Sequence, residues 1–144
     1  HLQYRVSCKA IEVVLSGFYD SIGLYESPSK NQIETAKEWL AIFQMSDIAN
    51  QPFKELEYGQ QRLLLIARAL IKQPALLILD EPYQGLDFLG RRLVVNSLEL
   101  IAKHKLSQLL FVSHYEEDAI DSIQNFVDFV PSEDGESYVV QITQ

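Results

Sequence analysis

The sequence predicts an α/β fold in which a helical half, residues 1–73, precedes a half built on a parallel sheet with helices, residues 74–144. Two observations support this prediction. In the first half, apolar residues recur every three or four positions, as on one face of a helix. In the second half, the apolar runs "ALLILD" (75–80) and "QLLFVSH" (108–114) each end on a polar side chain. Such runs are typical of parallel strands that are covered on both faces.

The helical half contains three expected helices. Residues 1–28 mix short apolar stretches with glycines and a proline, which indicates one short helix among loops. Ser29 is in position to cap a second helix. The apolar face of this helix consists of Ile33, Ala36, Leu40 and Phe43. A third helix is expected from Gln60 to just before Pro74, and its apolar residues lie nearly all round, which predicts that it is buried.

In the second half, Asp87 is expected to cap a helix of about 15 residues between the two apolar runs. Its predicted apolar stripe consists of Leu89, Leu93, Leu100 and Ile101. Strand, helix and strand in this order predict a right-handed crossover between parallel strands. The tail "NFVDFVPSEDGESYVVQI" predicts two further strands around a turn at Asp134–Gly135, at the edge of the fold.

Composition excludes several classes of function. The chain has 144 residues, a net charge of −8 and a single cysteine, Cys8. One cysteine forms neither a disulfide framework nor a cysteine metal cluster within the chain, and a cytosolic compartment is the default. No apolar run approaches the ~20 residues that span a bilayer. The acidic balance argues against nucleic acid as a partner, because a nucleic-acid groove needs clustered Lys and Arg.

Three segments carry candidate chemistry, and the first is the Leu56–Gln60 turn, which precedes a buried helix. A helix amino terminus presents free N–H groups and a partial positive charge, and both attract anions. Gly59 lets the backbone approach a ligand closely. An ordinary loop glycine in front of a core helix is an equally good interpretation of this turn taken alone.

The other two segments follow the predicted strands. In "LLILDEP" (76–82), Asp80 and Glu81 point in different directions, so that one can hold a hydrated Mg²⁺ while the other polarises a water molecule. A solvated Asp-Glu turn is the less favoured alternative. A lone His114 would more often be structural. At the end of the second strand, however, it can face a carboxylate at the end of the neighbouring strand.

In this order, the motifs resemble the ATPase domain of the ABC (ATP-binding cassette) family, which implies part of a P-loop NTPase fold. "LEYGQQR" resembles the family signature L-S-G-G-Q, and "LLILDEP" resembles the Walker B strand. "YQGLD" is similar to the D-loop, and "FVSH" is similar to the switch-histidine loop. Four motifs in the family order and spacing, across most of the chain, make the match specific.

The resemblance implies a role for each matching position. Asp80 would help to hold Mg²⁺, Glu81 would act as general base or orient the water, and His114 would contact the γ-phosphate of ATP. Asp87 would link the two halves of an ATPase dimer. The family closes two cassettes around ATP, so the signature would serve the nucleotide of a second cassette, whether a homodimer partner or a tandem domain. Its residues here are Leu56, Glu57, Tyr58, Gly59 and Gln60.

The sequence departs from the family pattern at two places. No G-x-x-x-x-G-K-[ST] motif occurs in the 144 residues, so we expect the chain to be the carboxy-terminal portion of a cassette and to be inactive by itself. Gln3 is the candidate for the Q-loop glutamine.

Glu57 and Tyr58 replace the usual serine and glycine of the signature. A carboxylate ~4 Å from a phosphate charge would cost about 4 kcal/mol. A Glu57 carboxylate turned toward the N-terminus of the helix would instead be stabilised by the helix dipole by roughly 0.3–1 kcal/mol. We therefore expect Glu57 to point back along the helix and away from the phosphate.

The function expected for the intact protein is that of an ATPase cassette driving a partner, foremost a membrane transporter. It would be cytoplasmic and peripheral at the inner face of the membrane. The aromatic segment "SGFYDSIGLY" (16–25) would face that transporter, or equally would pack the helical half. With "GQQRL" it is also similar to tandem-cassette proteins of molybdenum transport, which implies molybdate as substrate. The alternatives are a soluble cassette acting on DNA or ribosomes, and a regulatory cassette with weakened catalysis.

Overall fold

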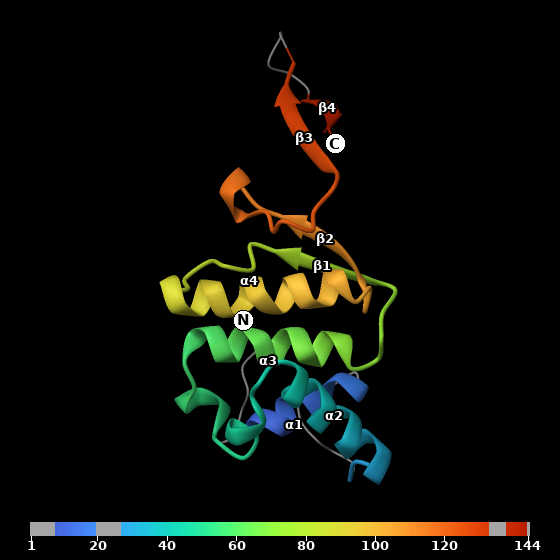
Figure 1. Cartoon of the computed structure of the whole chain (residues 1–144), viewed down its shortest axis with the longest axis vertical. Helices are drawn as coiled ribbons and strands as arrows, with labels where there is room; N and C mark the ends of the chain where they lie inside the picture. Colours follow the sequence, from blue (N-terminus) through green and yellow to red (C-terminus); the bar gives the residue numbers. More distant parts are fainter. Residues whose placement is uncertain (1–7, 20–26, 133–137, 144) are drawn as a thin grey trace.

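The structure is a computed structural model that describes residues 8–19, 27–132 and 138–143. Its helices are α1 (Ala10–Leu15), α2 (Lys30–Ile42), α3 (Tyr58–Leu70) and α4 (Phe88–Lys103), and its strands are β1 (Leu76–Asp80), β2 (Gln108–Val112), β3 (Phe126–Pro131) and β4 (Tyr138–Thr143). Short 3-10 helices lie at Ser16–Phe18, Ser46–Ile48, Phe53–Glu55 and Glu116–Asp118. Figure 1 shows α3 beside α4, with α1 and α2 packed beyond α3 and the strands beyond α4.

Helix α2 begins as the sequence predicts. The Ser29 hydroxyl accepts a hydrogen bond from the Gln32 N–H at 3.2 Å, and Gln32 Oε1 accepts one from the Ser29 N–H at 2.8 Å. This reciprocal capping box satisfies two N–H groups at the start of the helix. The predicted apolar face is confirmed, with Ile33 half-buried and Ala36, Leu40 and Phe43 buried.

Helix α3 is the centre of the hydrophobic core, as its apolar sequence predicts. It lies between α1 and α4, and therefore buries side chains on opposite sides. Its buried apolar side chains are Leu63, Leu64, Ile66, Ala67 and Leu70. Full burial of one leucine contributes roughly 1.5–3 kcal/mol, so this helix is a major source of stability. It begins two positions before the predicted Gln60, with Glu57 at its N-cap.

The predicted strand–helix–strand unit is confirmed as β1–α4–β2 with parallel strands. Leu77 pairs with Leu109, and Leu79 pairs with Phe111. Asp87 caps α4, because its Oδ1 accepts a hydrogen bond from the Gly90 N–H at 2.8 Å. The helix spans 16 residues, close to the predicted length.

The predicted apolar stripe of α4 is wrong at its start. Leu89 is 68% exposed, and Leu100 is only half-buried. The buried face consists of Val94, Ser97, Leu98 and Ile101. Gly90 faces α3 across a close backbone contact. Successive residues of a helix are rotated by about 100°, so the side chain before Gly90 is turned outward.

The prediction that both faces of the parallel sheet are covered is also wrong within the described residues. Leu77 and Leu79 of β1 are buried, whereas Ile78 between them is 59% exposed. The other apolar residues on the open face are Leu76, Leu110 and Val112. Alternate side chains of a strand point to opposite faces, and here one helical layer covers one face.

The tail forms two antiparallel strands, as predicted, with Val127 paired with Ile142 and Phe129 paired with Val140. Figure 1 shows this β3–β4 hairpin extending away from the helices, beyond β2. The predicted turn at Asp134–Gly135 lies outside the described residues. Among residues 8–19, 27–132 and 138–143, no helix combines the length and the apolar character that crossing a membrane requires.

Candidate functional site

The candidate site lies where the two parallel strands end. Asp80, the last residue of β1, is paired with Val112, the last residue of β2. The pairing continues for one residue, because the Glu81 N–H donates a hydrogen bond to the Val112 carbonyl at 2.9 Å. The acidic pair and His114 therefore emerge at the same edge of the sheet, as expected from the positions of both motifs after parallel strands.

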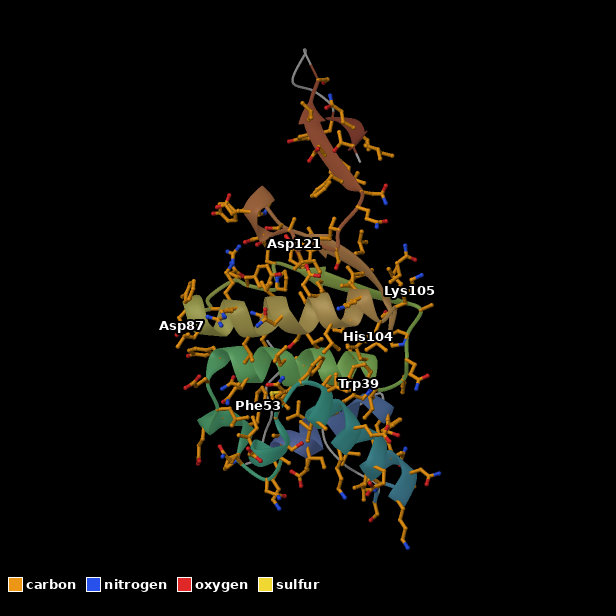
Figure 2. The ribbon with its side chains drawn as sticks, in the orientation of Figure 1. Trp39, Phe53, Asp87, His104, Lys105 and Asp121 are labelled. Carbon is orange, nitrogen blue, oxygen red and sulfur yellow. The ribbon has the colours of Figure 1, made fainter. Side chains whose placement is uncertain are left out.

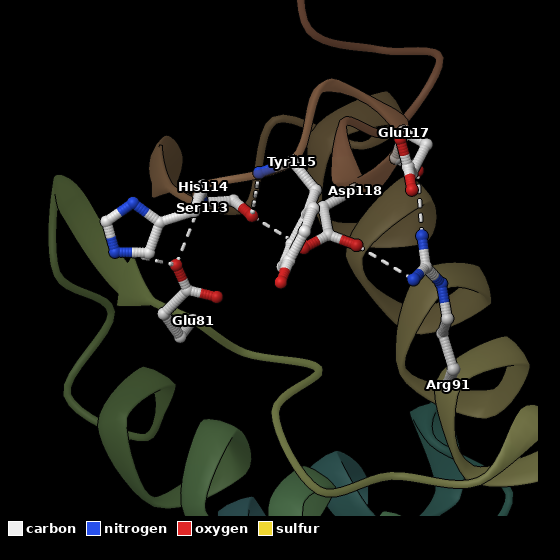
Figure 3. Close-up of polar contacts among 7 residues, drawn as sticks. All are labelled: Glu81, Arg91, Ser113, His114, Tyr115, Glu117 and Asp118. Atoms are coloured by element: carbon white, nitrogen blue, oxygen red, sulfur yellow. Dashed lines mark hydrogen bonds and ion pairs between the residues drawn. The ribbon is translucent and has the colours of Figure 1, made fainter.

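Glu81 and His114 are in direct contact (Figure 3). The Glu81 Oε1 atom accepts a hydrogen bond from the His114 backbone N–H at 3.0 Å and lies 3.7 Å from the imidazole Nε2. The Glu81 side chain is 23% exposed, whereas the His114 side chain is 87% exposed. The carboxylate thus fixes the backbone of the histidine, while most of the imidazole surface is open to a ligand.

The backbone of Glu81 has an unusual conformation. Its φ is 44°, in the left-handed region that a residue with a side chain rarely adopts. Such a conformation costs on the order of 1–3 kcal/mol and persists only where surrounding contacts hold it. Here the Glu81 N–H donates a hydrogen bond to the Val112 carbonyl, the Glu81 carboxylate accepts one from the His114 N–H, and the Glu81 carbonyl accepts one from the Gln84 N–H. The pattern is typical of a functional position, since strain of this kind clusters at active sites.

Asp80 differs from Glu81 in direction and exposure. By the alternation of β1, it shares the open face of the sheet with Leu76 and Ile78, and it is exposed. Mg²⁺ binds proteins through one or two carboxylates together with water and substrate phosphates. One exposed carboxylate beside the Glu81–His114 pair fits a magnesium ion that arrives with a phosphate ligand. Among the described residues, no group of three or more His, Cys, Asp or Glu could hold a metal ion.

The Leu56–Gln60 turn forms the start of α3. Leu56 is buried, Tyr58 is 75% exposed, and Glu57 is exposed at the N-cap. Gln60 Oε1 accepts a hydrogen bond from the Glu57 N–H at 3.2 Å, so the Gln60 side chain helps to close the first turn. Glu57 occupies the N-cap of α3, where the helix dipole would stabilise a carboxylate turned toward it. The pose of its side chain stays a prediction.

The Leu56–Gln60 turn lies beside the start of α4. An added Cβ on Gly59 would lie 2.6 Å from the Gly90 Cα atom, so the two backbones touch. The Arg62 Nη2 atom donates a hydrogen bond to the Gln84 carbonyl at 3.2 Å, which joins α3 to the loop after Glu81. Figure 1 shows the N-termini of α3 and α4 at the same end of the molecule as the carboxyl end of β1. Figure 2 marks Asp87 at this end, opposite His104 and Lys105.

Sequence reasoning missed three residues around His114, namely Arg91, Ser113 and Asp118. Arg91 of α4 forms an ion pair with Asp118, and Asp118 accepts a hydrogen bond from Ser113. Nothing in the sequence distinguishes Arg91 from its neighbour Arg92. Arg91 faces the loop after β2 because of how α4 is rotated about its own axis in the folded molecule.

Two predicted features lie wholly or partly outside the described residues. Gln3, the Q-loop candidate, is outside them. Of the segment 16–25, residues 20–25 are also outside, whereas Phe18 and Tyr19 are half-buried. Phe18 packs against the core, and the Tyr19 hydroxyl donates a hydrogen bond to Gln32 Oε1 at 3.2 Å. These two aromatic residues therefore contribute to the packing of the helical half.

Comparison with known families identifies the chain. The family profile described as "ABC transporter" matches residues 3–84, which is more than half of the sequence. This chain belongs to the ABC transporter family. The family predicted from the motifs is thereby confirmed.

Curated ABC relatives are considerably longer than the chain. The ABC transporter ATP-binding protein ModF of Escherichia coli K12 is 47% identical over 145 residues, which cover 100% of this chain and 29% of that protein. The uncharacterised ABC transporter ATP-binding protein YlmA of Bacillus subtilis is 42% identical over 112 residues, with coverages of 77% and 42%. The manganese transport system ATP-binding protein MntB of B. subtilis is 36% identical over 104 residues, with coverages of 72% and 41%. The chain thus spans less than half the length of these relatives.

Solved structures of ABC proteins share the fold of the chain. An ABC transporter in an inward-facing conformation matches with a TM-score of 0.73 at 20% identity, over 99% of this chain and 69% of that chain. The ADP conformation of MJ1267, an ATP-binding cassette of an ABC transporter, matches with a TM-score of 0.68 at 23% identity, over 83% of this chain and 50% of that chain. The dimeric cassette MJ0796 matches with a TM-score of 0.63 at 22% identity, over 88% and 55%. The predicted P-loop NTPase fold of the ABC type is therefore confirmed.

Proposed function

We propose that the chain forms part of an ATPase cassette that closes with a second cassette around ATP and so drives a membrane transporter. The contact between Glu81 and His114 at the ends of two paired strands carries this proposal. A carboxylate and an imidazole at one edge can act on the same phosphate and its attacking water. Membership in the ABC transporter family supports the same conclusion.

We propose a separate role for each residue of this edge. Glu81 orients the attacking water or accepts its proton, and its contact with the His114 backbone holds it in place. His114 contacts the γ-phosphate through its exposed imidazole. Asp80 helps to hold Mg²⁺, which neutralises phosphate charge when it is bound with ATP. Gln3 would complete the site as the Q-loop glutamine.

The Leu56–Gln60 turn and Asp87 would serve the second cassette. The turn opens a helix N-terminus, where N–H groups and a partial positive charge favour a phosphate. Tyr58, Phe88 and Leu89 are exposed, so they are accessible to another copy or to a tandem domain. In this proposal, residues 1–73 form a helical subdomain and residues 74–144 belong to the ATPase core.

Molybdate is our proposed substrate class. Its support is the resemblance of the segment 16–25, together with "GQQRL" of the signature, to tandem-cassette proteins of molybdenum transport. The cassette would then be cytoplasmic and peripheral at the inner face of the membrane. To test the substrate, molybdenum and manganese would be measured by mass spectrometry in cells with and without the full-length protein. If the cells without the protein contained less manganese but the same amount of molybdenum, manganese would replace molybdate as the proposed substrate.

ATP turnover by the full-length protein tests the catalytic proposal. We expect Glu81→Gln to lower kcat by about a hundredfold or more, because the amide cannot accept a proton from water. The amide oxygen of the variant can still accept a hydrogen bond from the His114 N–H, so the variant should be as stable to unfolding as the wild type. Glu38→Gln, an exposed substitution on α2, is the matched control and should leave kcat unchanged. An unaltered rate in Glu81→Gln would refute the role of Glu81.

Glu57 favours a second candidate, a regulatory cassette with weakened catalysis, because a carboxylate stands in the turn that would face a phosphate. That cassette would bind ATP and change the activity of a partner while hydrolysing ATP slowly. The full-length protein decides between the two: binding of ATP without turnover, in the presence of its second cassette, would favour regulation.

A further inference from the structure

Arg91 reaches from the first turns of α4 to the loops that follow both parallel strands. Its Nη1 atom lies 2.8 Å from Asp118 Oδ1, and its Nη2 atom donates a hydrogen bond to the Glu117 carbonyl at 2.7 Å. The guanidinium also lies over the ring of Tyr83, 5.0 Å from the ring centroid. Arg91 thus connects the loop after β1, which contains Tyr83, with the loop after β2. Figure 3 shows its contacts with Glu117 and Asp118 in the loop after β2.

Asp118 extends this connection to both neighbours of His114. Its Oδ2 atom accepts a hydrogen bond from the Ser113 hydroxyl at 2.5 Å, and its N–H donates one to the Tyr115 carbonyl at 3.1 Å. The Ser113 oxygen in turn accepts a hydrogen bond from the Tyr115 N–H at 3.1 Å. The backbone is therefore fixed immediately before and immediately after His114.

Burial makes this arrangement depend on the ion pair. The Asp118 side chain is only 7% exposed, and the Arg91 side chain is 38% exposed. A buried carboxylate that loses its cationic partner is strongly destabilised, so the loop would rearrange to expose it to water. His114 is 87% exposed and has little packing of its own, so its place is set by the backbone around it.

We propose that Arg91 and Asp118 are positioning residues that hold the Ser113–Tyr115 backbone so that His114 stays in contact with Glu81. The inference rests on the proposed function, in which Glu81 and His114 act on ATP. A purely structural role would weaken the fold as a whole and leave the chemistry of the folded enzyme unchanged. A positioning role would change kcat in protein that remains folded.

Four variants of the full-length protein separate these roles. Asp118→Asn and Arg91→Gln each remove the ion pair, their double variant removes both partners, and Arg91→Lys keeps the positive charge. Arg92→Gln is the matched control, because Arg92 is the exposed neighbour on the same helix. The measurements are kcat and KM for ATP, thermal unfolding, and hydrogen–deuterium exchange of the backbone amides of 113–118.

We expect Asp118→Asn and Arg91→Gln to lower kcat by about tenfold to a hundredfold, because displacements of about 1 Å have effects of this size. KM for ATP should stay within about twofold of the wild type, since an interaction needed only in the transition state is lost. The double variant should be no slower than the slower single variant, because both changes break the same contact. Arg91→Lys should retain part of kcat, and Arg92→Gln should match the wild type.

The amide exchange tests the positioning without any ATP turnover. The His114 amide should exchange faster in Asp118→Asn and Arg91→Gln, because its hydrogen bond to Glu81 is loosened. If the wild type hydrolyses no ATP, the proposed function fails while this local measurement still decides the positioning role. Where a charge variant unfolds, Ser113→Ala removes only the hydroxyl and should still accelerate exchange at His114 and Tyr115. Unchanged exchange at His114 in folded Asp118→Asn or Ser113→Ala, or additive losses of kcat in the double variant, would overturn the proposal.

Discussion

Gly59 and Gly90 are in backbone contact where α3 and α4 begin. A Cβ on Gly59 would lie 2.6 Å from the Gly90 Cα atom, and a Cβ on Gly90 would lie 3.3 Å from the Gly59 Cα atom. The contact brings the Leu56–Gln60 turn next to Asp87, which caps α4. The two segments that we propose to face a second cassette therefore lie side by side, and a side chain at Gly59 would meet the backbone of α4.

Gly59→Ala should lower the free energy of unfolding by about 1–3 kcal/mol, since the added methyl group meets rigid backbone. Gly90→Ala is the comparison. Its nearest neighbour would be the Asp87 Oδ1 atom at 3.0 Å, the end of a side chain, so a smaller loss is expected. Denaturant unfolding followed by circular dichroism measures both variants. Equal stability of Gly59→Ala and the wild type would show that the helices can separate at little cost.

Replacement of Glu81 should reveal the strain in its backbone. Glu81→Gly and Glu81→Ala both remove the carboxylate, but only glycine accepts the observed φ of 44° without steric penalty. We therefore expect the glycine variant to be more stable than the alanine variant by about 1 kcal/mol. Thermal unfolding of the two proteins gives the difference. A more stable alanine variant would mean that the turn relaxes once the carboxylate contacts with His114 are lost.

Glu57→Ser should raise the ATP turnover of the full-length protein. Serine would remove a negative charge from the turn that faces the phosphate of a second cassette, while it remains a good N-cap for α3. Glu55→Ser, an exposed change in the preceding 3-10 helix, controls for a general effect of charge. Steady-state phosphate release is the measurement, and an unchanged or lower rate in Glu57→Ser would count against the charge hypothesis.

Tyr83 should make the fold sensitive to alkaline pH. Burial raises the pKa of Tyr83 from 10.0 to about 12, although the nearby Arg91 acts in the opposite direction. Because the folded-state pKa lies above the unfolded value, the stabilisation is complete below pH ~10 and is lost as the pH rises toward about 12. Within the described residues, the buried Tyr83 hydroxyl has no hydrogen-bond partner, so Tyr83→Phe should be well tolerated at neutral pH.

The pH prediction is tested by the free energy of unfolding of wild type and Tyr83→Phe between pH 8 and pH 12, where lysines and other tyrosines also titrate. The phenylalanine variant should lose less stability over this interval than the wild type. Tyr58→Phe is the control, because Tyr58 is 75% exposed and should leave the pH dependence as it is. Parallel curves for wild type and Tyr83→Phe would contradict the predicted effect of burial.

Elements with a strong local pattern were predictable from the sequence. The Ser29 and Asp87 caps, the buried helix α3 and the β1–α4–β2 unit all follow from periodicity and capping residues. The edge that carries Asp80, Glu81 and His114 follows as well, because parallel strands place their carboxyl ends together. Two features were not predictable, namely which side chains of α4 are buried and which face of the sheet is left open. Both depend on the elements that pack against α4 and the sheet.

The sequence alone thus determined the order of the elements, the family and the residues at the strand ends. The tertiary structure decided that Arg91, rather than Arg92, reaches Asp118, that Glu81 adopts a left-handed backbone, and that two glycines bring α3 and α4 into contact. The physical reason is distance along the chain. Glu81 and His114 are 33 positions apart and meet only once the strands pair, whereas a helix cap or an apolar period is set by residues within a few positions of one another.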